Sequence, residues 1–145
     1  MNKPSRPTRA DYKIFYPITT RWSDNDIYGH VNNVVYYAYF DTVINEYLIR
    51  EGGLDIAAGD VIGVAVETHC QFMSALRFPD LVHAGLRVAK IGTSSVRYEI
   101  GRFAEHSDSP AAEGYFVHVF VDRQTRRPER IPETIRAALA KIAVN

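Results

Sequence analysis

The sequence predicts a single α+β domain in which an antiparallel sheet covers one long helix. The first observation is an apolar segment from Val34 to Ile49 that few polar residues interrupt and that Gly52-Gly53 follows, which is typical of a buried helix. The second is a series of four later segments rich in Val, Ile, Tyr and Phe, which indicates consecutive strands. Because the helix precedes these strands instead of alternating with them, the α+β class is favoured.

The elements follow in order from local patterns. We expect a first strand from Tyr12 to Trp22, where apolar and polar residues mostly alternate, and a helix from about Asn33 to Arg50. Pro17 cannot donate a ladder hydrogen bond, so the first strand is expected at a sheet edge or a bulge. Four further strands are expected at Ile62 to Met73, Leu81 to Ile91, Ser95 to Ala104 and Ala111 to Asp122.

Turn residues define the connections and a second helix. Gly92-Thr93-Ser94 predicts a tight turn between two strands, and Glu105 to Pro110 predicts a polar loop. After a basic loop over 123–130, Pro132 and Glu133 are typical of a helix start. The apolar residues of this last helix recur at helical spacing, at Ile135, Ala138, Leu139 and Ile142.

Composition limits the number of domains and the class of partner. With 145 residues, 46% of them hydrophobic, the chain can bury one core but has no room for a second full domain. We expect a flexible N-terminal tail over 1–10 and one domain over 11–145. The 17 basic and 17 acidic side chains balance, so the totals indicate neither a nucleic-acid surface nor an anionic-membrane surface.

Cysteine and histidine usage bears on location and metals. The single cysteine, Cys70, excludes an intramolecular disulfide and is typical of a reducing compartment, so we expect a cytoplasmic protein. The apolar helix is too short to cross a bilayer comfortably, so no membrane span is expected. The histidines lack the clustering of metal ligands, and no metal site is predicted.

The run from Asp24 to Asn33 carries the chemistry. Within it, Gly29 permits a left-handed turn, and Asn32 or Asn33 can cap the helix that follows. Asp26 then lies close to helix N–H groups that have no intrahelical partner and can polarise a carbonyl oxygen. A carboxylate that faces such an oxyanion site indicates acyl chemistry.

Written as Asp-x-Asp-x-x-Gly-His-Val-Asn-Asn, this run resembles the signature of the hotdog-fold acyl-CoA thioesterases, in particular the 4-hydroxybenzoyl-CoA thioesterase superfamily. The order of elements extends the resemblance from about Tyr12 to Lys141. It implies a hotdog fold, in which the sheet wraps around the long helix, and hydrolysis of an acyl-CoA to free acid and CoA without a further cofactor. It also implies a homodimer, since sites of this family combine two chains, and relatives include homotetramers.

The resemblance assigns roles within the run. It implies that Asp26 is the catalytic carboxylate, as a base or as a nucleophile, while Asp24 is structural. It implies that the backbone N–H of Asn33 faces the thioester carbonyl. His30 could hold substrate, orient water, transfer a proton or make a structural hydrogen bond across the turn. Without the whole motif, an aspartate before a helix is more often a cap or turn former.

Two groups of residues are candidates for the phosphates of CoA. Lys90, Thr93 and Ser94 combine an ammonium, two hydroxyls and the N–H groups of a turn. Arg126 and Arg127 belong to the basic loop and could attract the nucleotide. The alternative readings are a plain polar hairpin and a solvated loop.

Two other functions remain open on the same fold. A non-catalytic acyl-CoA-binding module would usually carry a DNA-binding segment or lack the carboxylate, whereas Asp26 is present and only a short tail precedes the domain. A hydratase or dehydratase would require a different helix entrance, which the run lacks.

Overall fold

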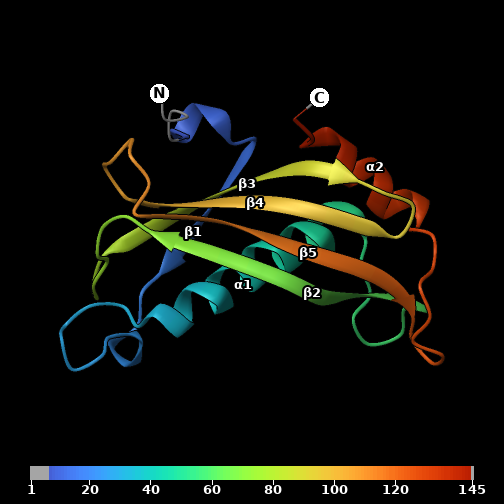
Figure 1. The fold of residues 1–145 in the computed structure, drawn as a ribbon, viewed down its shortest axis with the longest axis horizontal. Helices are drawn as coiled ribbons and strands as arrows, with labels where there is room; N and C mark the ends of the chain where they lie inside the picture. The colour runs from blue at the N-terminus through green and yellow to red at the C-terminus, as the bar shows by residue number, and fades with distance from the viewer. Residues whose placement is uncertain (1–6, 145) are drawn as a thin grey trace, which may run out of the picture.

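The computed structural model describes residues 7–144 as one helix-on-sheet domain (Figure 1). Five antiparallel strands lie in the order β1-β3-β4-β5-β2, a long helix lies against one face, and a shorter helix lies near one end. The elements are β1 (Ile14–Thr19), α1 (Asn33–Gly52), β2 (Val61–Phe72), β3 (Leu81–Ile91), β4 (Ser95–Ala104), β5 (Ala112–Asp122) and α2 (Glu133–Lys141). The predicted α+β architecture is confirmed.

The first strand is the element whose extent differs most from prediction. The strand was expected to reach Trp22 but ends at Thr19. Residues Trp22–Asp24 form a short 3-10 helix instead. The reason is local, because the Asp24 carboxylate turns back and accepts a hydrogen bond from the backbone N–H of Arg21. Pro17 pairs with His83 of β3 in a strand at the edge of the sheet, as expected.

Both ends of α1 are set by cap residues that the sequence identified. Asn32 Oδ1 accepts a hydrogen bond from the backbone N–H of Val34 at 2.9 Å, which closes the first turn. At the other end Gly53 takes a φ of 67°, a left-handed conformation that favours glycine, and its N–H donates to the carbonyl of Leu48.

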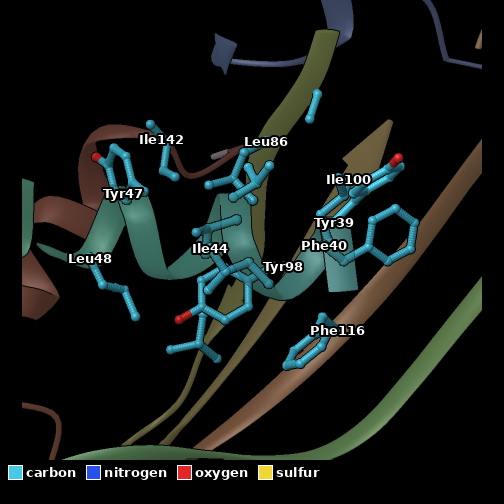
Figure 2. Packing of buried hydrophobic residues seen from close by; sticks show 14 of the residues in the cluster. Tyr39, Phe40, Ile44, Tyr47, Leu48, Leu86, Tyr98, Ile100, Phe116 and Ile142 are labelled. Carbon is cyan, nitrogen blue, oxygen red and sulfur yellow. The ribbon is translucent and has the colours of Figure 1, made fainter. Parts of the chain in front are cut away.

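The core lies between α1 and the helix-facing side of the sheet. Phe40, Ile44 and Leu48 of the helix are completely buried, and they pack toward Leu86 of β3 and Ile100 of β4 (Figure 2). Removing this much apolar surface from water is the main favourable contribution to folding.

The second helix closes one end of this core. Ile135, Ala138, Leu139 and Ile142 are all buried, so the predicted apolar stripe is confirmed. Tyr47 of α1 donates its hydroxyl proton to the carbonyl oxygen of Ala138, which joins the two helices.

The N-terminal segment of the chain covers part of the opposite face of the sheet. The ring of Tyr12 lies over Gly85 and Gly101, where a Cβ atom would come within 2.8 Å and 2.6 Å of the ring. The first six residues of the expected tail over 1–10 lie outside the described residues. In the remainder, the Arg9 guanidinium donates to the carbonyl oxygens of Ser107 and Ala104. Within the described part of the chain, no helix is both long and apolar enough to cross a membrane.

Candidate active site

The loop before α1 is held by a tight turn. Gly29 takes a φ of 80°, as predicted for a left-handed turn. The backbone N–H of Asp26 donates to the carbonyl of His30 at 2.9 Å, and the N–H of Gly29 donates to the carbonyl of Asp26 at 3.0 Å. These bonds bring Asp26 and His30 close together at the start of the helix.

Asp24 anchors the inner side of this loop. Only 1% of its surface is exposed, and its carboxylate accepts hydrogen bonds from the Arg21 backbone and guanidinium and, at 2.6 Å, from the hydroxyl of Tyr39. Its carbonyl accepts the N–H of Asn32 at 2.8 Å. Burial alone would raise the pKa of Asp24, but the bonds from Tyr39 and Arg21 outweigh it and lower the pKa. Asp24 is therefore a structural residue.

Asp26 lies on the outer side of the same loop and is only partly buried. One carboxylate oxygen accepts the N–H of Tyr28 at 2.8 Å. The side chain lines a cavity of about 360 Å³ together with His30 and Asn33. The structure thus brings the three predicted catalytic residues together at one cavity.

The first turn of α1 borders that cavity through Asn33 and holds a free hydrogen-bond donor. The N–H groups of Val34 and Val35 are both bonded to Asn32, through its side chain and its carbonyl. Within residues 7–144, by contrast, the N–H of Asn33 has no hydrogen-bond partner. A free N–H at the positive end of a helix is a suitable donor to a carbonyl oxygen that gains negative charge.

The remaining walls come from α1 and from the segment at the end of β2. Tyr36 and Phe72 meet edge to face with ring centres 4.9 Å apart, and Met73 continues the apolar wall. Ser74 and Ala75 complete the rim. Sequence analysis did not identify the four residues from Phe72 to Ala75, because the end of β2 and the segment after it reach the helix only in three dimensions.

The residues predicted to meet CoA phosphates lie at the other end of the sheet (Figure 1). The turn with Thr93 and Ser94 packs against β5 and the chain after it, since the Ser94 carbonyl accepts the N–H of Phe120 in β5 and the Thr93 carbonyl accepts the N–H of Ile131. A ten-residue strand such as β4 spans roughly 30 Å. Within one chain, that strand separates Lys90 and this turn from the Asp26 cavity.

Two arginines lie beside this turn: Arg130, which belongs to the basic loop expected to attract the nucleotide, and Arg136, which the sequence analysis did not single out. A cavity of about 340 Å³ is lined by Thr93, Arg130 and Arg136, together with Ile91 and Gly92. Arg136 donates to the carbonyls of Gly92 and Thr93. The pattern that could have identified Arg136 is its place in the first turn and a half of α2, next to the basic loop.

Arg126 and Arg127 are exposed in the loop that follows β5. Arg126 takes a left-handed φ of 63°, and its N–H donates to the carbonyl of Asp122. The carboxylate of Asp122 accepts two further N–H groups of the loop, which explains its lowered pKa. The loop is thus held by hydrogen bonds within itself, and both arginines are exposed to solvent.

A still larger cavity, of about 910 Å³, lies on the exposed side of α1. It is bordered by the second half of the helix, the start of β2 and Arg123, with Asn45, Ile49 and Ile62 among its lining residues. Its carboxylates, Asp41 and Glu46, lie inside α1, beyond the first turn that leaves helix N–H groups free. Among residues 7–144, no group of three His, Cys, Asp or Glu side chains is arranged to hold a metal ion.

Comparison with solved structures shows close relatives of this fold. The PA5185 protein from Pseudomonas aeruginosa strain PAO1 is 53% identical, with a TM-score of 0.94 over 96% of this chain and 97% of that one. Slr0204, a 1,4-dihydroxy-2-naphthoyl-CoA thioesterase from Synechocystis, has a TM-score of 0.79 at 16% identity, over 87% of this chain and 94% of its own.

Sequence comparison agrees with the structural one. YsmA of Bacillus subtilis strain 168 is 20% identical over 96 residues, which are 66% of this chain and about 65% of YsmA's own length. The family model of the thioesterase-like superfamily matches residues 20–139, which include the whole run from Asp24 to Asn33 and all elements from α1 to β5. The chain therefore belongs to the thioesterase-like superfamily, and its five-stranded antiparallel sheet on one long helix is the hotdog fold.

Proposed function

We propose that this protein hydrolyses acyl-CoA thioesters at the Asp26 cavity. The observation that carries the proposal is that the partly exposed Asp26 lines one cavity together with Asn33, whose helix N–H has no partner within residues 7–144. Apolar walls from Tyr36 and Phe72 suit an acyl chain. The CoA class is also supported by Slr0204, whose name states that it acts on an acyl-CoA.

In the proposed reaction the thioester carbonyl oxygen accepts the N–H of Asn33. Asp26 either takes a proton from water, which then attacks the carbonyl carbon, or attacks that carbon itself to form an anhydride that water cleaves. In both routes a C–O bond forms, the C–S bond breaks, and CoA leaves as a thiolate. A thiol has a pKa of about 8.5, so the thiolate can leave with little help from an acid. His30, exposed at the rim, is a candidate to hold substrate or orient water.

The hydrolysis experiment measures free-thiol release from short, medium, long and aromatic acyl-CoAs. Asp26→Asn removes the charge but keeps the shape, so we expect turnover to fall about a hundredfold or more while acyl-CoA still binds. Near-normal turnover of the Asp26→Asn protein would remove Asp26 from the mechanism. Tight binding of acyl-CoA without turnover by the wild-type protein would favour the non-catalytic binding module instead.

We further propose that the active protein is a homodimer paired along β2. This strand is at the edge of the sheet, has twelve residues, and is exposed through its middle, where Val66 is 58% exposed. An unpaired edge of this length is a ready site for another strand. Antiparallel pairing of β2 with its own copy gives a closed two-fold interface.

Such pairing would also complete the substrate site. In an antiparallel pair the Phe72 end of one β2 lies near the Val61 end of the other. The cavity at Asp26 would then adjoin the second chain's groove beside Ile62 and Arg123, and the turn at Thr93 lies at that same end of the sheet. This arrangement explains how a turn far from Asp26 in one chain could meet phosphates of a substrate bound in the other.

Light scattering combined with the hydrolysis assay tests the dimer. The wild-type protein should have at least twice the mass of one chain, and Val66→Glu should lower both the mass and the activity, because it places a charge at the proposed interface. A fully active monomer would refute the two-chain site.

A further inference from the structure

Arg102 is a buried cation without a hydrogen-bond partner. It lies on β4, where the alternation of Tyr98, Ile100 and Arg102 turns its side chain toward α1, and none of its surface is exposed. Its three guanidinium nitrogens have no partner among residues 7–144. Arginine carries five N–H donors, and leaving them unpaired in a protein interior costs several kcal/mol by rough estimate.

The surroundings of Arg102 offset its charge only in part. The guanidinium carbon lies 4.0 Å from the centre of the Tyr39 ring and 5.7 Å from that of Tyr36, so both rings make cation–π contacts. The nearby carboxylate of Asp24 is already bonded to Arg21 and Tyr39. Burial lowers the pKa of Arg102 to about 10, which still leaves it charged at neutral pH. The aromatic faces supply no hydrogen-bond acceptor.

The position of Arg102 relates it to the candidate active site. Tyr36 lines the Asp26 cavity, and Arg102 lies against the ring of the same Tyr36. Tyr36 also meets Phe72, which is 41% exposed and so has room to move. The cation is thus one aromatic ring away from the cavity that would hold the acyl group.

We propose that Arg102 binds a carboxylate at the far end of the acyl group, so that the preferred substrates are thioesters of dicarboxylic acids. This inference rests on the proposed hydrolysis at Asp26 and adds the substrate class. A shift of the Tyr36 ring would open the path, and the carboxylate would then meet the planar guanidinium through two parallel N–H···O bonds. An acyl chain with an apolar end would leave the donors of Arg102 unpaired.

The test compares adipoyl-CoA with heptanoyl-CoA, in which an ethyl group replaces the far carboxylate. The ratio of kcat/KM for the two substrates is measured for the wild type, for Arg102→Met and for Arg97→Met, with rates corrected for spontaneous hydrolysis. Arg97 is the matched control, since it lies on the same strand with its guanidinium over the ring of Tyr115 but is exposed. Succinyl-, glutaryl- and pimeloyl-CoA, each with its apolar analogue, extend the comparison to other lengths.

We expect the wild type to prefer the dicarboxylic member of at least one pair. Arg102→Met should lower that preference by about tenfold to a hundredfold, as expected for the loss of a hydrogen-bonded charge, and Arg97→Met should keep it. A wild type that prefers the apolar member of every pair overturns the inference. So does an Arg102→Met protein that loses activity equally on both members, because Arg102 would then only support the fold.

Two measurements cover the other outcomes. If Arg102→Met does not fold, Arg102→Lys replaces it, because lysine keeps the charge but lacks the two parallel N–H donors of the guanidinium. Bidentate binding is contradicted if Arg102→Lys keeps the full wild-type preference for the dicarboxylic substrate. Free adipate should raise the Tm of the wild type more than heptanoate does, and equal shifts count against the carboxylate site. If the wild type hydrolyses no acyl-CoA, the proposed function fails, whereas hydrolysis without any dicarboxylic preference refutes only the role of Arg102.

Discussion

The inner and outer sides of the loop before α1 differ in how many hydrogen-bond partners their carboxylates have. Asp24, on the inner side, is buried and bonded to Arg21 and Tyr39. Asp26, only two residues later, faces a cavity and accepts one bond from the backbone of Tyr28. A carboxylate with all its partners within the chain stabilises the fold, whereas one with free acceptor capacity is available to a substrate or water.

The largest expected effect is a difference between the two carboxylates in how much each contributes to the free energy of unfolding. Asp24→Asn should lower the free energy of unfolding by about 3 kcal/mol, since a neutral amide replaces the charged acceptor of the buried Tyr39 hydroxyl and of the exposed Arg21 guanidinium. Asp26→Asn should change it by less than about 0.5 kcal/mol, because that side chain is partly exposed and accepts a single hydrogen bond. Urea denaturation measures both. Equal losses would mean that the inner and outer sides of the loop do not differ in this way.

A second expectation concerns the pH dependence of a buried group elsewhere in the core. Burial among Tyr98, Phe116 and Phe120 lowers the pKa of His118 from 6.5 to about 4. Between these values the unfolded chain binds more protons than the folded one, so stability is lost as the pH falls from 6.5 to 4. The loss is at most about 3 kcal/mol.

His118→Gln removes this titration, so its free energy of unfolding should vary less than that of the wild type across the same pH range. Carboxylates such as Asp24, whose folded pKa is lowered, add to the loss of stability only as the pH falls from their unfolded pKa of about 4. Identical pH profiles for the two proteins would show that His118 is not held neutral in the folded state.

A smaller effect is expected from the hydroxyl that joins Asp24 to α1. Tyr39→Phe should cost about 2 kcal/mol, because it removes a hydrogen bond to a charged acceptor and keeps the ring over Arg102. In a double-mutant cycle with Asp24→Asn the two changes should not add, since they remove one interaction. Full additivity would show that the 2.6 Å contact contributes no stability.

The smallest effect is expected at the exposed arginines far from the loop. Replacing Arg126 and Arg127 with Ala should raise KM for acyl-CoA by about threefold at low salt and leave kcat nearly unchanged, as for exposed ion pairs. Wild type and variant should converge as salt screens the phosphates. An acyl-pantetheine substrate without the nucleotide is the control, and impairment on it would show that these side chains do not act through CoA phosphates.

Much of the fold was predictable because its determinants are local. The bounds of β3 and β4 and the start of α1 follow from alternation, turn residues and a helix cap, which involve neighbours a few residues apart. The edge position of β1 follows from the missing N–H of Pro17. The early end of β1 was missed because a side-chain bond from Asp24 to the Arg21 backbone overrides the alternating pattern.

The order of the elements follows from local patterns along the chain. So does the turn that brings Asp26, His30 and Asn33 together, because its hydrogen bonds join residues within ten positions of one another. Which charges find partners depends instead on how distant segments pack. Tyr39 reaches Asp24 across fifteen residues, and Arg102 comes to lie against Tyr36 from a strand much later in the chain. Burial and pairing of charges depend on contacts between distant segments, and no short pattern encodes them.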